Sequence, residues 1–317
     1  MRKSDFYESM QSLERRKREA GAESTADLYR AVRNRFGRYC MKERLLLKDV
    51  TAAWVAGFRA ALRKEGLRVN TVNSYMSCLR AMYNAASREA GGRRKENPFE
   101  GLRLKREETK KRAVPVEVVE RIAGLNLRDN PELAGAVDLA LFSFMACGMP
   151  FTDLVHLTRE NIQDGGRLLV YRRRKTGVLI QIGINTGMRQ LIERYARPGS
   201  AYLFPVLPAD ARHETYKAAL SFHNRHLKEI GRLLGLAVPL TSYVFRHTWA
   251  SEAYRCHVEI RVISQALGHT TEKMTRNYLA RLAPEEIIKA NEKVSHKIEK
   301  LIGKEARPYF INKVRQT

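Results

Sequence analysis

Six residues in the second half of the chain have side chains suited to metal-free chemistry on a phosphodiester: Arg173, Lys175, Tyr243, Arg246, His269 and Tyr278. Such a reaction requires a nucleophile, cations that stabilise a pentavalent phosphate, and an acid for the leaving oxygen. Arginine suits the cation role because its planar guanidinium stays charged and matches two phosphate oxygens. Lysine suits the acid role because its pKa falls when other cations crowd it.

The spacing of these residues predicts the elements that carry them. In "YRRRKTG", Arg173 and Lys175 are two residues apart on an expected strand, so we expect both on one side of a hairpin. In "LTSYVFRHTWAS", Tyr243, Arg246 and His247 are spaced i, i+3, i+4 and therefore share one face of an expected helix. Taken singly, each residue has an ordinary explanation: a helical tyrosine is usually core and a basic hairpin is usually solvated.

The stretch "ALGHTTEKMTRNYLAR" places His269 nine residues before Tyr278. Nine residues of one helix turn by about 900°, which points the two side chains to opposite faces. They can share a site only if the helix is interrupted between them. Gly268 is a candidate helix terminator, and Thr270 or Thr271 is a candidate N-cap for the next helix.

The charge of the chain indicates a polyanionic partner. Its 317 residues include 58 Lys and Arg against 34 Asp and Glu, a net charge of +24. Nucleic acid is the commonest such partner, and an anionic membrane surface is the rival. No apolar run approaches the roughly 18 residues of a membrane span, and the first residues lack the apolar stretch of a secretion signal. We therefore expect a cytoplasmic protein.

Metal binding has little support in the sequence. Four cysteines are scattered with no paired spacing: Cys40, Cys78, Cys147 and Cys256. This pattern favours neither a disulfide framework nor a zinc site. His223 and His226 form an HxxH on an expected helix, but with no second ligand pair we expect them to be surface histidines.

Composition and periodicity divide the chain into two domains and two basic segments. Residues 1–103 carry apolar stripes at helical spacing, which predict a bundle of four or five short helices. Residues 104–114 form a basic linker, which either follows a phosphate backbone or is a solvated connector. The second domain is expected over residues 115–303 and a basic tail over residues 304–317.

The second domain is expected to be mainly helical with one hairpin. A helix led by Pro115 and a long apolar helix come first, and "RLLVYRRRKTGVLIQIGI" then predicts two strands around a tight turn at Thr176–Gly177. Near the end, a near-heptad apolar stripe runs from Ile287 to Leu301. By itself this stripe predicts an internal packing helix.

The order of four motifs resembles the tyrosine recombinase (phage integrase) family. An R-x-K-T-G hairpin, Y-x-x-R-H-T-W-A, L-G-H and a tyrosine nine residues later occur in the expected order. More narrowly, the chain is similar to integrases of Bacteroides-type mobile elements. The resemblance covers the whole chain. It implies a mainly α fold with a small β-sheet, made of a helical SAM-like core-binding domain and an α+β catalytic domain of the DNA breaking–rejoining fold.

The resemblance also implies roles for individual residues. Tyr278 matches the nucleophile, which would form a 3′-phosphotyrosyl link to DNA and release a 5′-hydroxyl. Lys175 matches the acid that protonates the leaving oxygen, and Arg246 matches an arginine that clamps the non-bridging oxygens. His269 matches a further donor to the phosphate. No metal and no cofactor is implied, because the phosphotyrosine bond conserves the energy for rejoining.

Two positions depart from the family pattern. Tyr243 occupies the place of a histidine, and a phenol with a pKa near 10 is a poor base at neutral pH. The related mobile-element integrases often have this tyrosine. The family motif T-G-x-R-x-x-E-L corresponds here to "CGMPFTDL", with Pro150 in place of the arginine and Asp153 at the acidic position. We expect Arg173 to supply the missing cation and Asp153 to have a structural role.

The resemblance implies a site-specific DNA recombinase that integrates or excises a mobile element. Its expected partners are double-stranded DNA, three further copies in a tetrameric synapse, and DNA-bending accessory proteins. The resemblance also implies that the stripe from Ile287 to Leu301 is a C-terminal helix that docks on a neighbouring protomer, rather than an internal packing helix. A separate arm-binding domain is expected to be absent or reduced to a short N-terminal segment. Two alternatives remain: a DNA-binding protein that kept the clamp but lost the chemistry, which Pro150 favours, and a type IB topoisomerase-like nicking–closing enzyme.

Overall fold

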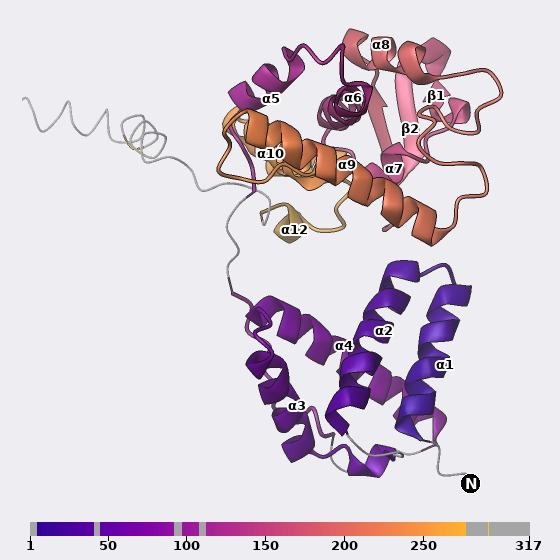
Figure 1. The fold of residues 1–317 in the computed structure, drawn as a ribbon, viewed down its shortest axis with the longest axis vertical. Helices are drawn as coiled ribbons and strands as arrows, with labels where there is room; N and C mark the ends of the chain where they lie inside the picture. Colours follow the sequence, from indigo (N-terminus) through magenta and orange to yellow (C-terminus); the bar gives the residue numbers. More distant parts are fainter. Residues whose placement is uncertain (1–4, 41–44, 92–96, 108–111, 277–290, 292–317) are drawn as a thin grey trace, which may run out of the picture. The chain divides into compact units, whose positions relative to one another are not determined.

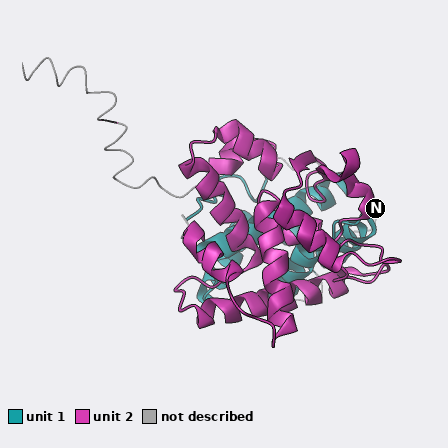
Figure 2. Ribbon diagram, turned by 90° about the horizontal axis from the view of Figure 1, so that it is seen from above, with its two compact units in different colours: residues 1–110 teal, residues 111–317 magenta. Residues whose placement is uncertain are grey.

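The computed structural model describes residues 5–40, 45–91, 97–107, 112–276 and 291. The chain divides into two compact units, residues 1–110 and residues 111–317 (Figure 2). Over the described residues, no helix has the length and apolar character needed to cross a membrane.

Unit 1 is a helical bundle, as predicted (Figure 1). Its helices are α1 (Phe6–Glu19), α2 (Glu23–Cys40), α3 (Ala52–Lys64) and α4 (Val69–Glu89), with a 3-10 turn at Leu47–Asp49. Polar caps start two of them: Asp5 accepts a hydrogen bond from the Tyr7 amide at 2.9 Å, and Thr51 accepts one from the Trp54 amide at 3.1 Å.

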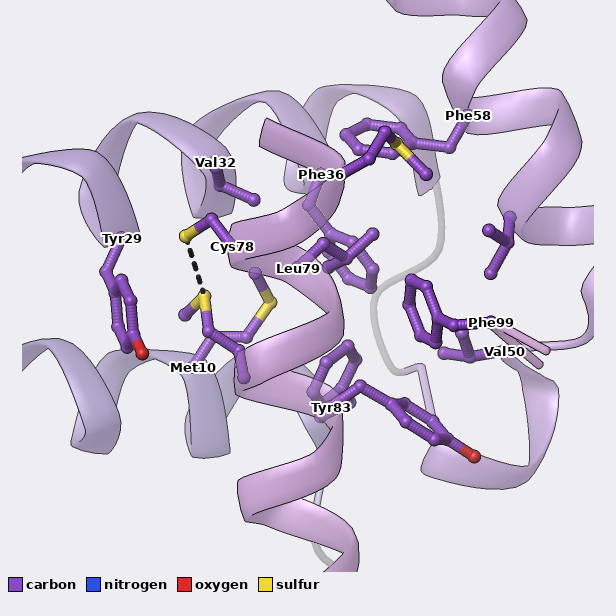
Figure 3. Close-up of a cluster of buried hydrophobic side chains, with 14 of the residues drawn as sticks. Met10, Tyr29, Val32, Phe36, Val50, Phe58, Cys78, Leu79, Tyr83 and Phe99 are labelled. Carbon is purple, nitrogen blue, oxygen red and sulfur yellow. Dashed lines mark hydrogen bonds between the residues drawn. The ribbon is translucent and has the colours of Figure 1, made fainter. Parts of the chain in front are cut away.

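Aromatic side chains form the centre of unit 1 (Figure 3). Phe36 lies edge-on to Phe6 at 5.3 Å between ring centroids and within 6.2 Å of Phe58. Each such edge-to-face pair contributes about 0.5–1.5 kcal/mol of stability beyond the contribution of the area that it buries. The apolar stripes of this domain therefore build a core.

The first part of the predicted basic linker is bound to α4. Asn73 Nδ2 donates to the Lys105 carbonyl at 2.8 Å, and the Asn70 side chain both donates to and accepts from the Glu107 backbone, at 2.8 and 3.1 Å. These contacts fix residues 105–107 to unit 1. On the other side, the Val114 amide donates to Thr248 Oγ1 of unit 2 at 3.0 Å.

Unit 2 is built around α6 (Pro131–Met145), an apolar helix that starts at an Asn130 cap with proline in its first turn. It contacts the helices α5 (Val116–Ala123), α7 (Phe151–Leu154), α8 (Thr186–Tyr195), α9 (His213–Leu233) and α10 (Ser242–Arg255). In Figure 1, α6 lies between α5 and the small sheet. The short helices α11 (Ile260–Leu267) and α12 (Glu272–Arg276) follow α10.

The sheet has three antiparallel strands in the order β1 (Ile162–Gln163), β2 (Leu168–Arg172) and β3 (Leu179–Gly183). The predicted hairpin is therefore confirmed, although the two-residue strand β1 was not predicted. The placement of Arg173 and Lys175 on a strand was wrong, because β2 ends at Arg172. Both lie in the connection to β3, which the Arg173 amide closes by donating to the Val178 carbonyl at 2.9 Å.

The prediction that His223 and His226 are surface residues was wrong, since they are 4% and 6% exposed. They belong to the stripe of α9 that also carries Leu227 and Ile230, and this stripe faces α6. His223 stacks on Phe151 at 4.6 Å between ring centroids. His226 Nδ1 donates to the Phe222 carbonyl at 3.0 Å, and its Nε2 lies 3.0 Å from a Glu132 carboxylate oxygen.

Candidate active site

Arg246 is a buried guanidinium at the centre of the candidate site. It lies on α10, is 2% exposed and donates through Nη1 to the Gly148 carbonyl at 2.9 Å. Its Nη2 donates to the Leu267 carbonyl at 2.6 Å and lies 3.2 Å from His269 Nε2. Gly148 permits this approach, because a Cβ at that position would lie 2.8 Å from the Arg246 Cα.

Arg173, on the hairpin, also binds the Leu267 carbonyl. Its Nη1 donates to this oxygen at 2.5 Å, and its side chain is 7% exposed. Gly268 has φ +65° and caps α11, and a Cβ there would lie 2.8 Å from Arg173 Cγ. Two guanidinium groups therefore converge on the last residue of α11, where a helix C-terminus carries partial negative charge.

Asp153 holds Arg173 in place. Its Oδ2 lies 2.7 Å from Arg173 Nε, and its Oδ1 accepts from the Arg174 amide at 2.9 Å. Burial raises the pKa of this carboxyl, and the Arg173 guanidinium beside it opposes that rise. The expected structural role of Asp153 agrees with these contacts. With one carboxylate beside two guanidinium groups, the cluster is net positive, which suits an anion.

His269 follows the Gly268 cap and contacts two other elements. Its Nε2 faces Arg246, and its Nδ1 lies 2.9 Å from Thr275 Oγ1 on α12. Burial, together with the charges of Arg246, Arg173 and Lys175, lowers the pKa of His269 to about 4. The imidazole is therefore neutral near pH 7. A guanidinium can only donate, so Nε2 accepts, whereas the predicted role made His269 a donor.

Lys175 and Tyr243 lie next to this cluster in more exposed positions. Lys175 is exposed on the hairpin turn, and the neighbouring Thr176 hydroxyl donates to the Gly268 carbonyl at 3.4 Å. Tyr243 is 41% exposed on α10, one turn before Arg246, with its ring 5.4 Å from the His247 ring.

The structure thus brings Arg173 and Arg246 to one carbonyl and His269 into contact with Arg246, with the turn of Lys175 beside them. The predicted helix break between His269 and Tyr278 is confirmed, because α11 ends at Leu267 and α12 begins at Glu272. Tyr278 itself, the Ile287–Leu301 stripe apart from Asn291, and the tail 304–317 lie outside the described residues.

Sequence reasoning missed Gly148 and Thr275. Gly148 had a local signal, since a glycine directly before a helix-starting "MPF" often takes a positive φ, and its φ is +68°. Thr275 had none, because nothing local distinguishes it from the exposed threonines Thr270 and Thr271. Pro150 precedes α7, and Arg173 contacts Asp153 on that same short helix. A guanidinium therefore lies beside the segment that lacks the family arginine.

Comparisons with known proteins match both parts of the chain to one family. Residues 5–107 match the phage integrase SAM-like domain, and residues 117–285 match the phage integrase family. The tyrosine recombinase XerD of Pseudomonas putida is 29% identical over 161 residues, or 49% of this chain and 53% of XerD, so that match spans about half of the relative. The tyrosine recombinase XerA of Pyrococcus horikoshii is 26% identical over 241 residues, covering 72% of this chain and 75% of XerA.

Solved structures show the same fold at low sequence identity. The Tn1549 transposon integrase in complex with transposon right end DNA superposes with a TM-score of 0.62 at 15% identity, covering 92% of this chain and 99% of that one. A lambda integrase tetramer bound to a Holliday junction gives 0.65 at 16% identity, covering 88% and 78%. With both family domains matched in order, the chain belongs to the phage integrase family and is a tyrosine site-specific recombinase.

Proposed function

We propose that this recombinase integrates or excises a mobile element by cleaving and rejoining DNA through a 3′-phosphotyrosyl intermediate. The observation that carries the proposal is the convergence of Arg173 and Arg246 on the Leu267 carbonyl, beside His269. Both guanidinium groups are held before any phosphate arrives, so little reorganisation is needed when charge develops on the phosphate oxygens.

Tyr278 is the proposed nucleophile. Its phenolic oxygen attacks the phosphorus, the phenolic proton leaves to solvent, and the bond from phosphorus to the 5′ oxygen breaks. Lys175 gives a proton to that 5′ oxygen, which leaves as a hydroxyl. Attack by the 5′-hydroxyl of another strand reverses these steps and rejoins DNA. The phosphotyrosyl bond keeps the energy of the cleaved bond, so the reaction as proposed uses no cofactor.

We propose that Arg173 replaces the family arginine, whose position in this chain is occupied by Pro150. It contacts Asp153 on α7, which begins directly after Pro150, and it shares a carbonyl with Arg246. Together the two guanidinium groups would bind the non-bridging oxygens. Tyr243, one turn before Arg246, would donate a hydrogen bond. This tyrosine also favours the narrower assignment to integrases of the Bacteroides type.

The proposed partner is double-stranded DNA, bound by residues 1–103 as the core-binding domain and residues 115–303 as the catalytic domain. The net charge of +24 favours contacts to the phosphate backbone. We propose self-association on DNA up to a tetramer, by analogy with the lambda integrase tetramer on a Holliday junction. Accessory DNA-bending proteins would assist, and the reaction would take place in the cytoplasm, at the nucleoid.

Covalent trapping tests the proposal. A preferred duplex would be selected by the protein from a random-sequence pool, and a set of versions with a nick at successive positions would serve as suicide substrates. We expect the parent to form a covalent adduct on at least one of them and Tyr278→Phe to form none. Binding without an adduct from the parent would overturn the enzyme proposal and favour the binding-only alternative that Pro150 supports.

A further inference from the structure

The hydroxyl of Thr275 lies completely inside unit 2 and contacts the site. Thr275 is 0% exposed, whereas the other described residues of α12 are exposed. Its Oγ1 lies 2.9 Å from His269 Nδ1, across the break between α11 and α12. A valine would fill the same space, so packing alone does not call for a hydroxyl here.

The second contact of His269 decides which nitrogen carries the proton. Arg246 Nη2 lies 3.2 Å from His269 Nε2, and a guanidinium has donors but no acceptor. A proton on Nε2 would place two N–H groups against each other, so Nε2 must accept. In the neutral ring the proton is then on Nδ1, which donates to Thr275 Oγ1. Arg246 thus sets the tautomer of His269, and Thr275 accepts the remaining ring proton and holds the ring in place.

We propose that Thr275 is a positioning residue for DNA cleavage: its hydroxyl accepts from the Nδ1–H of the tautomer that Arg246 imposes on His269, holds the ring with Nε2 facing Arg246, and so helps to orient the guanidinium that binds the phosphate. The role in cleavage rests on the function proposed above. The same hydrogen bond ties α12 to the cationic cluster, three residues before Tyr278 in the sequence.

Removing the hydroxyl has a defined consequence. Without an acceptor, the half-buried Nδ1–H is left unsatisfied, and the His269 ring rotates towards another acceptor. This rotation takes Nε2 away from Arg246 and removes one of the contacts that hold the guanidinium. Threonine and serine can both accept the bond, whereas valine cannot, so the three side chains separate the hydroxyl from the shape.

The experiment compares Thr275→Val and Thr275→Ser with the parent in the full chain. ¹⁵N NMR of the His269 ring, assigned with His269→Asn, reports the tautomer and the hydrogen bonds of both nitrogens, and single-turnover adduct formation on the suicide duplex reports cleavage. We expect Thr275→Val to move both ring signals from their parental positions, because the ring loses its hydrogen bonds, and to slow cleavage about tenfold or more. Thr275→Ser should keep the parental signals and most of the rate.

Thr270→Val is the matched control, because it makes the same replacement at an exposed position of the same connection. It should leave both measurements unchanged, and thermal unfolding should show that every variant is folded. Parental ring signals and a parental rate in Thr275→Val would overturn the inference, as would a loss in Thr275→Ser equal to that in Thr275→Val. If the parent itself forms no adduct, the proposed function fails, while the NMR comparison still decides whether Thr275 holds the His269 ring in place.

Discussion

Replacing Arg173 with alanine removes the guanidinium that we propose in place of the missing family arginine. Arg173 Nε lies 2.7 Å from Asp153 Oδ2, and the two side chains are 7% and 1% exposed. Breaking a buried pair by removing one partner costs about 3–5 kcal/mol, because the other charge stays buried. Asp153 would keep its hydrogen bond from the Arg174 amide, so we expect the lower end of that range.

The stability loss should depend on pH in a defined direction. Burial already raises the pKa of Asp153, and without Arg173 the largest opposing charge is gone, so its pKa rises further above the unfolded value. A carboxyl with a raised folded pKa destabilises the fold above the unfolded pKa. The deficit of Arg173→Ala should therefore be largest near neutral pH and shrink as the pH falls through the folded pKa of Asp153.

The effect on cleavage must be separated from this loss of stability. In the double variant Arg173→Leu/Asp153→Asn both charges are gone, and a buried pair replaced in this way often costs little stability. Cleavage should nevertheless stay about 10²–10³-fold slower than in the parent, the cost of losing one donor to a developing oxyanion. The single variant Asp153→Asn keeps the guanidinium and is the control.

Thermal unfolding and single-turnover adduct formation on the suicide duplex measure the two effects. DNA binding is measured in parallel to show that the duplex is still occupied. The proposed role of Arg173 would be refuted by parental cleavage in the double variant. It would also be refuted if the rates of all three variants followed their stabilities alone.

Two further predictions concern Lys175 and His223. Lys175→Met should keep DNA binding but slow cleavage by about 10²–10⁴-fold, the usual contribution of a general acid. A duplex with sulfur in place of the 5′ bridging oxygen should restore the rate, because a thiolate leaves without a proton; no restoration would assign Lys175 another role. Burial lowers the pKa of His223 to about 4, so the fold prefers the neutral ring and loses stability as the pH falls below the unfolded pKa of about 6.5. Between pH 7 and pH 5 this histidine should cost about 2 kcal/mol in the free energy of unfolding, and the same slope in His223→Gln would contradict that assignment.

Local patterns in the sequence were sufficient to predict the fold class and most of the elements, though not strand β1. Apolar stripes at helical spacing predicted the bundle of unit 1, alternation predicted the pairing of β2 with β3, and Gly268 predicted the end of α11. These features depend on residues within one or two turns of each other, so spacing and cap chemistry report them directly. The order of the motifs also indicated the family, because all four local signatures occur in this one sequence.

The contacts of the site depend on packing between distant segments. Arg173 and Leu267 are 94 residues apart, and they meet because the hairpin turn lies against the end of α11. We expected Arg173 and Lys175 on one side of the hairpin because both would lie on one strand. That reason was wrong, since β2 ends at Arg172 and the Arg173 side chain contacts Asp153. Burial of His223 and the bond from His269 to Thr275 likewise follow from which faces α9 and α12 turn to their neighbours. Periodicity shows that such faces exist, but only the packed helices and hairpin determine which polar groups meet there, and hence which of them are charged.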